Sequence, residues 1–343
     1  MKTIILNKPG EFEVSEMESP QETLNAGEAL VKVHRIGICG TDLHAYTGKQ
    51  PFFTYPRILG HELGVEVIKV ADDVTNVEVG DKCSVEPYFN KTQDHAVERG
   101  FTNCGENISV FGVHEDGGMR EYFKIPAQYL HVSKKLSYDQ LALVETLSIG
   151  CHAVNRARVN AEDTVVVIGA GPIGMGACQF AMAAGAKTVM MDINQSRLDF
   201  CDKHIKVDGT VEVHQEVAET EKRIRAQFDG NLPTVVIDAT GNKHSMANTL
   251  QFTAAAGRIV FVGLFPGDFS FHDPYFHKKE LTIMASRNSL PSDFDQIIEM
   301  IENNQIDTNP WITHKVLFTD IAGHFDSWLK PETGVIKAML TLS

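Results

Sequence analysis

Residues whose side chains could bind a metal ion occur in two short stretches near the amino terminus. The first carries Cys39 and His44, and the second is Gly60-His61-Glu62. Thiolate, imidazole and carboxylate groups are the donors that a divalent ion such as zinc accepts. Segment 48–59 between them contains two prolines and is predicted to be a loop that brings both stretches together. Cysteine and histidine are also common in protein cores, so the spacing alone leaves a metal site and an ordinary core as alternatives.

A second pattern with chemical meaning lies in the middle of the chain. The apolar run 164–168 is followed by Gly169-Ala170-Gly171-Pro172-Ile173-Gly174, then by an apolar helical segment, 175–184, and a second strand, 188–191. Strand, glycine-rich turn, helix and strand in this order form a dinucleotide-binding unit. The start of the helix offers free N–H groups to the phosphates. The residues of this turn that we expect to contact the cofactor are Gly169, Gly171, Pro172, Ile173 and Gly174.

The type of dinucleotide is indicated by an acidic residue. Asp192 ends the second strand, 23 positions after Gly169. A carboxylate there accepts hydrogen bonds from the ribose hydroxyls and repels a 2′-phosphate, which favours NAD over NADP. Arg197 lies close in sequence and could serve a phosphate, so NADP stays an alternative. Further cofactor contacts are expected where later strands end, from Thr240, Val262, Gly263 and Leu264.

The bulk composition limits the classes of function. The chain has 343 residues, which suggests two domains, and carries a net charge of −14 with a pI of about 5.4. This charge argues against nucleic acid or an anionic membrane surface as partner. We find no signal peptide and no apolar window long enough to span a bilayer. Six cysteines without a signal peptide indicate a reducing compartment, and we expect the cytoplasm.

The remaining segments predict how these residues are positioned. The first 90 or so residues read as short strands and turns, and 90–107 is a polar excursion. Segment 141–157 is apolar at helical spacing and carries Glu145, which by itself could also lie on an exposed helix face. Strands and helices alternate after residue 164, which predicts a parallel sheet. The tail is predicted to contain helices over 294–301 and 321–328 and a strand over 335–340, and to pack on the amino-terminal domain.

A zinc-type loop followed by a dinucleotide fold resembles the medium-chain zinc-dependent alcohol dehydrogenases. The resemblance rests on 37–44, on Gly60-His61-Glu62 and on the glycine-rich turn 169–174, and it covers essentially the whole chain. It implies an α/β protein with a GroES-like β-barrel catalytic domain over 1–148 and 287–343. Residues 149–286 would form a doubly wound Rossmann domain that binds NAD.

Within this family the chain most resembles the polyol and sugar-acid dehydrogenases. The resemblance implies oxidation of a secondary hydroxyl, with hydride transfer to NAD and a zinc ion acting as a Lewis acid. Among small-molecule substrates, we expect a hexonate such as L-galactonate to rank near the top. Sorbitol-type and L-threonine-type dehydrogenases are alternatives. A homodimer or homotetramer joined through the edge of the Rossmann sheet is also implied.

The family's metal ligands fall on residues of this chain. By the resemblance, Cys39 and His61 bind the catalytic zinc, and Glu62 is the third ligand or a neighbouring carboxylate that holds the ion. Glu145 lies where polyol-type enzymes place a glutamate, and would bind zinc directly or through water.

Proton transfer and substrate binding are assigned in the same way. Thr41 corresponds to the hydroxyl that takes the proton of the alcohol, and His44 to the base that passes it to solvent. The resemblance also implies substrate contacts from Arg287 and Phe111, with Arg287 a partner for a substrate carboxylate.

The chain departs from the family at the lobe that often holds a structural zinc. The four cysteine positions of that lobe fall on Asn90, Gln93, Ala96 and Cys104. Asparagine, glutamine and alanine are not effective zinc ligands, so we predict one catalytic zinc and no structural zinc.

Two other functions fit the same fold. A zinc-free quinone-type reductase would keep the fold without the metal, although Cys39, His61 and Glu145 together argue against it. A binding protein without catalytic activity is the second, because fold alone does not determine function. The Thr41 and His44 pair has no evident purpose in such a protein.

Overall fold

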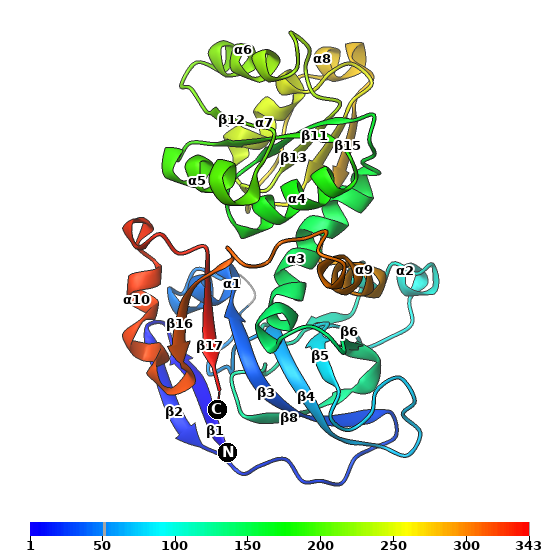
Figure 1. Cartoon of the computed structure of the whole chain (residues 1–343), viewed down its shortest axis with the longest axis vertical. Helices are drawn as coiled ribbons and strands as arrows, with labels where there is room; N and C mark the ends of the chain where they lie inside the picture. The colour runs from blue at the N-terminus through cyan, green and yellow to red at the C-terminus, as the bar shows by residue number, and fades with distance from the viewer. Residues whose placement is uncertain (51–52, 343) are drawn as a thin grey trace. The chain divides into compact units, whose positions relative to one another are not determined.

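The protein is represented by a computed structural model in which residues 1–50 and 53–342 are described. Pro51 and Phe52, part of the predicted loop 48–59, lie outside the described residues. The chain forms two compact units, one of residues 1–146, 290–304 and 311–343 and one of residues 147–289 and 305–310. Figure 1 labels many of the helices and strands. Within the described part of the chain, no helix has both the length and the apolar character needed to cross a bilayer.

The first unit is built mainly from antiparallel strands. Its strands are β1 Lys2–Lys8, β2 Glu11–Glu16, β3 Glu28–Ile38, β4 Glu62–Val70, β5 Lys82–Val85, β6 Tyr88–Asn90, β7 Ile108–Val110, β8 Tyr122–Pro126, β9 Leu130–Val132, β16 Ile312–Leu317 and β17 Lys337–Thr341. Its helices are α1 Gly40–Tyr46, α2 His95–Glu98, α9 Pro291–Glu302 and α10 Phe325–Trp328, and α3 Tyr138–Ala157 begins in it. The main sheet has the order β16-β17-β3-β4-β5-β9, with β8 also paired to β3.

The pairing of β3 with β4 brings the two candidate metal-binding stretches together. The antiparallel register sets Gly37 opposite Glu62, so the end of β3, just before Cys39, lies beside the start of β4. A Cβ atom on Gly37 would lie 2.1 Å from Oε2 of Glu62, a distance that only glycine avoids. Farther along, Val33 faces Val65 in the buried core of the unit. The hydrophobic strands therefore determine where the chemical groups meet.

The tail returns to this sheet. β17 runs antiparallel to β3, with Ala338 opposite Ile38, and β16 pairs in parallel with β17. The single helix predicted over 321–328 is wrong: the chain forms a 3₁₀ helix over Phe318–Gly323 and then the short α10. Gly323 lies at this break, and glycine is costly inside a helix because it loses the most backbone freedom on folding.

The polar lobe 90–107 is held by hydrogen bonds. Asp94 caps α2, because its Oδ1 accepts hydrogen bonds from the backbone N–H groups of Ala96 at 2.9 Å and Val97 at 3.1 Å. Its Oδ2 accepts from the N–H of Glu106 at 2.6 Å, which ties the start of the lobe to its end. The side-chain amide of Asn90 donates to the carbonyl of Thr102 at 2.9 Å.

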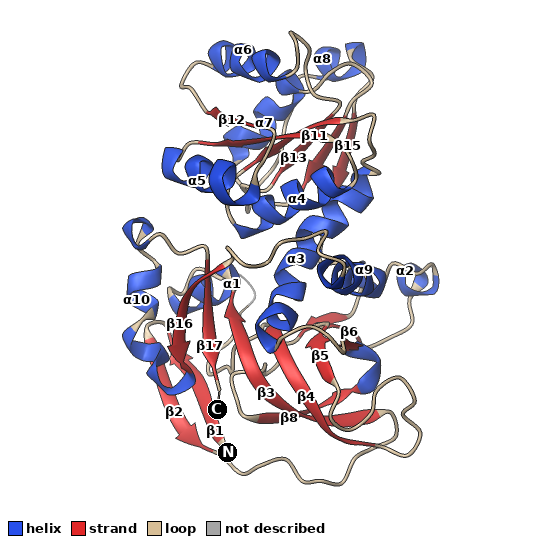
Figure 2. Cartoon of the chain, viewed as in Figure 1, coloured by secondary structure: helices blue, strands red, loops and turns tan. Residues whose placement is uncertain are grey.

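The second unit is a parallel sheet of six strands. Its strands are β10 Thr164–Ile168, β11 Lys187–Asp192, β12 Gly209–Glu212, β13 Val235–Asp238, β14 Arg258–Phe261 and β15 Thr282–Ala285. Its helices are α4 Pro172–Ala183, α5 Gln195–Phe200 with a π-helical turn to Ile205, α6 Val217–Gln227, α7 Lys243–Phe252 and α8 Asp273–Lys278. The order β12-β11-β10-β13-β14-β15 reverses direction between β10 and β13, and helices lie on both sides of the strands (Figure 2). This is the predicted doubly wound fold, which binds ligands beyond the carboxyl ends of the strands at the reversal.

The glycine-rich turn follows β10 at that reversal. Gly169 has a φ of +103°, a conformation that residues with a Cβ atom rarely adopt. A Cβ atom on Gly174 would lie 1.9 Å from the carbonyl oxygen of Gly169, so a side chain there would push α4 away from β10. The turn thus has the conformation that the sequence pattern predicts.

A buried histidine links α9 to the sheet of the first unit. His131 is 6% exposed, and its ring nitrogens lie 2.8 Å from Oδ1 of Asp295 and 3.2 Å from Oε2 of the buried Glu86. Its ring stacks on Phe294 of α9. Burial lowers the pKa of His131, but the two carboxylates outweigh burial and the pKa is raised.

We expect this histidine to make stability depend on pH. Because its pKa is higher in the folded protein, its contribution is complete below about pH 6.5, the ordinary histidine value, and is lost as pH rises through the folded pKa. The wild type should therefore lose melting temperature relative to His131→Gln as pH rises from 6.5 toward 9. Melting curves recorded across this range would test it, and parallel pH dependences for the two proteins would contradict it.

Candidate active site

Three of the predicted metal donors meet at the junction of β3 and β4. Sγ of Cys39, a ring nitrogen of His61 and a carboxylate oxygen of Glu62 lie within 4.8 Å of one another. His61 and Glu62 are 4% and 0% exposed, so no bulk water solvates their polar atoms. Sulfur, nitrogen and oxygen donors at such spacing can converge on one divalent ion after small side-chain movements.

Asp42 orients both sides of this group. Its Oδ2 accepts a hydrogen bond from the backbone N–H of Cys39 at 2.9 Å, which shapes the start of α1. Its Oδ1 lies 3.8 Å from Nδ1 of His61, and within the described residues both atoms are buried without a hydrogen-bond partner. A carboxylate beside Nδ1 favours a proton on that nitrogen and leaves the other ring nitrogen free to bind a cation.

The pKa of His61 shows that negative charge prevails around this group. Burial lowers the pKa of His61, but the negative charges of Asp42, Cys39 and Glu145 outweigh burial and hold the pKa well above its ordinary value. Without a metal, a proton on His61 partly balances these charges. The site therefore attracts positive charge at the position where a cation would bind.

Glu62 is held by a buried lysine. Nζ of Lys337, on β17, lies 2.6 Å and 2.8 Å from the two carboxylate oxygens, and Lys337 is only 3% exposed. Thr146 donates its hydroxyl hydrogen to Oε1 at 2.5 Å. Burial raises the pKa of Glu62, but Lys337 is the main group that outweighs it, and the pKa is lowered. Glu62 is therefore fixed as a carboxylate, with lone pairs left for a metal.

Glu145 lies near this group without joining its closest set of donors. It is 4% exposed, and its charge acts on both His61 and Lys337. The hydroxyl of Tyr88, on β6, donates a hydrogen bond to Oε1 of Glu145 at 2.5 Å. Burial is the main reason that the pKa of Glu145 is raised. The alternative of an exposed helix face for Glu145 is thus wrong.

The donor set fits a divalent cation. Cys39, Asp42, Glu62 and Glu145 are four acidic groups, and Lys337 is the permanent positive charge that acts on them. Buried charges of one sign are costly unless they are paired or bind a metal. A divalent ion bound by the thiolate, imidazole and carboxylate would offset most of this excess.

The two predicted proton-transfer residues lie on α1. Oγ1 of Thr41 lies 3.6 Å from Sγ of Cys39, so its hydroxyl is beside the metal-binding group. Thr41 is half-buried and His44, almost one turn later, is exposed. A hydroxyl near the reacting group followed by an exposed imidazole could conduct a proton to solvent.

Asp192 and Arg197 are placed differently around the glycine-rich turn. Oδ2 of Asp192 accepts a hydrogen bond from the N–H of Ala170 at 2.6 Å, and Oδ1 accepts from Asn194 at 2.8 Å. Nη1 of Arg197 lies 3.9 Å from the point that a Cβ atom on Gly171 would occupy. The guanidinium group is thus near the turn that receives the pyrophosphate in dinucleotide folds.

The other predicted cofactor residues lie at the carboxyl edge of the same sheet. Thr240 follows β13 and donates its hydroxyl hydrogen to Asp238 at 2.7 Å. Gly263 packs closely on Gly241, since a Cβ atom on it would lie 2.0 Å from the N of Gly241. The residues after β14 are Val262, half-buried, and Leu264, which is 84% exposed.

The sequence did not predict Ile193, which follows Asp192 and exposes 79% of its surface. Such apolar side chains at a ligand edge are suited to cover a cofactor.

The two predicted substrate residues differ in exposure. Arg287 follows β15 and is exposed. Phe111 is 4% exposed and packs between Phe89 and Phe123 in the core of the first unit. Its ring therefore offers little surface to a substrate.

Several residues of the site were missed in the sequence. They are Asp42, Tyr88, Thr146 and Lys337. One signal was available: Lys337 lies within the predicted apolar strand 335–340, and a lysine in such a strand must find a buried anion. The partner itself could not be predicted, because Glu62 and Lys337 are 275 residues apart.

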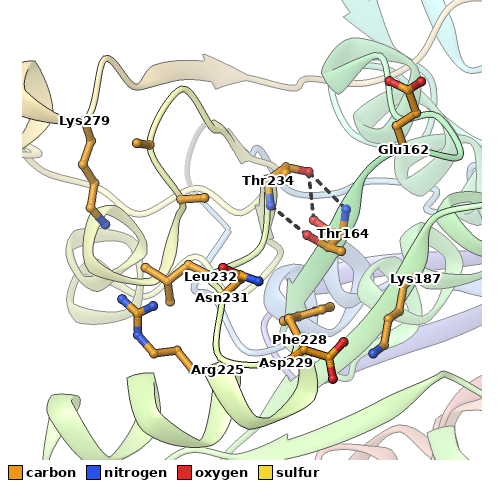
Figure 3. A pocket seen from close by; sticks show the side chains of 12 residues that line it. Glu162, Thr164, Lys187, Arg225, Phe228, Asp229, Asn231, Leu232, Thr234 and Lys279 are labelled. Carbon is orange, nitrogen blue, oxygen red and sulfur yellow. Dashed lines mark hydrogen bonds between the residues drawn. The ribbon is translucent and has the colours of Figure 1, made fainter.

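A surface hollow elsewhere in the second unit contains none of these residues. Figure 3 shows it at the starts of β10 and β13, near Thr164 and Thr234, whereas the glycine-rich turn follows the end of β10. Nζ of Lys279 already donates to three carbonyl groups at the end of α7. Arg225 pairs with Glu221. These two basic side chains of the hollow thus already have partners within the second unit. The hollow also contains none of the candidate site residues.

Two protein families match the chain, one in each half. The alcohol dehydrogenase GroES-like domain matches residues 25–135, and the zinc-binding dehydrogenase family matches residues 172–303. The chain is 39% identical over 342 residues to L-galactonate-5-dehydrogenase of Escherichia coli (strain K12), covering 99% of each protein. It is 30% identical over 324 residues to L-arabinitol 4-dehydrogenase of Hypocrea jecorina, covering 92% of this chain and 86% of that protein.

A solved structure has the same fold. The alcohol dehydrogenase rspB from E. coli CFT073, complexed with the cofactor NADH, matches with a TM-score of 0.91 and 28% sequence identity. The match covers 100% of this chain and 99% of that one. The predicted combination of a GroES-like domain and a Rossmann-type parallel sheet is confirmed.

We expect Lys337→Met to weaken the site and the fold together. The change leaves the buried carboxylate of Glu62 without its cation, which should cost about 3–5 kcal/mol in the free energy of unfolding. Lys315→Met is the matched control, because Lys315 lies on the neighbouring β16 in an exposed pair with Asp139 and should contribute less than about 1 kcal/mol. Urea unfolding of the metal-free proteins measures both values. Equal stabilities for the two variants would contradict the role of Lys337.

Proposed function

Since the chain belongs to the medium-chain zinc-type alcohol dehydrogenase family, we propose that it oxidises a secondary hydroxyl of a sugar acid, with L-galactonate as the preferred candidate. The protein is an NAD-dependent zinc-type dehydrogenase. The observation that carries the proposal is the close approach of Cys39, His61 and Glu62, in a chain 39% identical to L-galactonate-5-dehydrogenase. A polyol is the second substrate class, as in L-arabinitol 4-dehydrogenase.

The residues of the first unit prepare the alcohol for oxidation. When it is bound by Cys39, His61 and Glu62, zinc would act as a Lewis acid and lower the pKa of a substrate hydroxyl. The hydroxyl of Thr41 accepts the proton of the substrate while it gives up its own, and His44 takes up the released proton and passes it to solvent. Lys337 and Thr146 hold Glu62 in its ionised form.

The second unit binds the hydride acceptor. The N–H groups at the start of α4 and the glycine-rich turn receive the pyrophosphate of NAD. Asp192 accepts hydrogen bonds from the adenosine ribose, and Arg197 assists the phosphates. Thr240, Val262, Gly263 and Leu264 line the remaining part of the cofactor site. Arg287 pairs with the substrate carboxylate, which fits a sugar acid better than a neutral polyol.

We further propose that zinc occupies the catalytic site alone. The polar lobe 90–107 is tied by Asp94 and Asn90 through hydrogen bonds within the lobe. Cys104 is exposed and donates to the carbonyl of Phe101, and no close metal-donor group forms in the lobe among the described residues.

The chain is proposed to form a homodimer or homotetramer through β15. This strand is the last in the order of the parallel sheet, and two of its four residues are exposed. The nearby aromatic residues Phe269, Phe271 and Phe276 contact one another, and Phe271 is 42% exposed. An edge strand beside exposed aromatic rings is suited to pair with a second copy. All six cysteines are free, which supports a cytoplasmic location.

We expect wild-type protein to contain one zinc per chain and to form NADH with L-galactonate. Cys39→Ala should lose the zinc and about a hundredfold or more of the activity, because a direct ligand is removed. Cys104→Ser is the matched control and should keep both. Metal analysis is combined with absorbance assays on hexonates, alditols and short amino alcohols. Full zinc and activity in Cys39→Ala, or two zinc ions in wild type, would contradict the assignment, and no turnover on any substrate would favour a binding protein.

We also expect a preference for NAD that depends on Asp192. Hydrogen bonds to a charged group contribute about 1.5–3 kcal/mol, so Asp192→Asn should lose roughly tenfold to a hundredfold in kcat/KM for NAD. Asp199→Asn, a change on the exposed side of α5, serves as control and should have little effect. Initial rates with NAD and NADP give the comparison. Wild type that prefers NADP would rule out the role of Asp192.

A further inference from the structure

A buried tyrosine contacts the second carboxylate of the site. The hydroxyl of Tyr88 donates to Oε1 of Glu145 at 2.5 Å, and these residues are 2% and 4% exposed. The length is at the short end of the range for a hydroxyl bound to an ionised carboxylate. Because this hydrogen bond is short and buried, movement of either side chain would break it.

The tyrosine is anchored by its own strand. Tyr88 opens β6, where it pairs with Val110 of β7. The next residue, Phe89, packs against Phe111 and Tyr129 in the core. Glu145 comes from a different element, α3. The hydrogen bond therefore connects the two-stranded sheet of β6 and β7 to the helix that carries Glu145.

Glu62 and Glu145 have different hydrogen-bond partners. Both oxygens of Glu62 contact Lys337, whereas Tyr88 provides a neutral donor to Oε1 of Glu145. The charges of Glu62 and Glu145 also oppose each other. A neutral donor fixes the direction of a carboxylate without cancelling its charge, so Glu145 keeps its attraction for a cation.

We propose that Tyr88 is a positioning residue that holds Glu145 beside the catalytic cation and so determines how tightly the cation is bound. The inference rests on the proposed zinc site. Partners that orient groups around a metal typically contribute tenfold to a hundredfold in metal affinity or activity. Tyr88 acts through Glu145 and does not itself bind the metal.

The test compares two buried tyrosines of the first unit. Tyr88→Phe removes the hydroxyl that binds Glu145, and Tyr129→Phe removes one whose oxygen accepts from the N–H of Asn90 at 3.2 Å. Zinc dissociation constants are measured on metal-free protein by competition with a chelator. Tyr88→Phe should bind zinc about tenfold to a hundredfold more weakly, and Tyr129→Phe should stay within about twofold of wild type. The absorption bands of the cobalt-substituted protein should change only in Tyr88→Phe.

A double-mutant cycle separates positioning from a general loss of packing. If Tyr88 acts through Glu145, Tyr88→Phe has no further effect on zinc affinity in the Glu145→Gln protein. Wild-type affinity and an unchanged cobalt spectrum in Tyr88→Phe would overturn the proposal, as would equal losses in both backgrounds. Melting curves verify folding, and Tyr88→Met replaces Tyr88→Phe if the latter does not fold, because methionine adapts to irregular space.

The outcomes also distinguish this inference from the proposed function. Wild-type protein that binds no zinc or forms no NADH with any substrate would disprove the proposed function itself. Wild-type protein that does both, with Tyr88→Phe unaffected, would disprove only the role of Tyr88.

Discussion

The active-site region depends on an excess of buried negative charge. Three buried carboxyl groups, a buried lysine and a half-buried thiol come from the region of β3, β4, α1, α3 and β17. Water has little access to the three carboxyl groups, so the protein must supply positive charge. Lys337 supplies one part, and a bound cation the other. Hydrogen bonds from Thr146, Tyr88 and the backbone N–H of Cys39 then fix the direction of each carboxylate.

This arrangement is possible because of the hydrophobic register of the first unit. Runs of buried residues lie along both β3 and β4, and their antiparallel pairing sets Gly37 opposite Glu62. The absence of a side chain at Gly37 leaves the space that Glu62 occupies. The second unit follows the same logic, since Gly174 allows close packing of the helix that presents its amino terminus to a phosphate.

Local patterns in the sequence predicted much of this. The glycine-rich turn, Asp192 and the alternation of strands and helices predicted the doubly wound sheet, which is confirmed. The stretches around Cys39 and His61 predicted donors that the structure brings close together. These signals are local because each depends on neighbours within one supersecondary unit.

Interactions between distant segments could not be read in the same way. Lys337 and Tyr88 contribute through contacts that join residues 275 and 57 positions apart. The prediction of one helix over 321–328 was wrong, because the chain divides at Gly323 into a 3₁₀ helix and α10. Phe111 was assigned to substrate binding by resemblance, yet its ring packs against Phe89 and Phe123 and is buried.

The lobe of residues 90–107 closes through its own polar side chains. Asn90 donates to the carbonyl of Thr102, and Asp94 accepts from the N–H of Glu106. Both hydrogen bonds join residues 12 positions apart, so each closes a short loop at a small cost in chain entropy. The lobe can therefore form early in folding, before the distant strands of the first unit have paired.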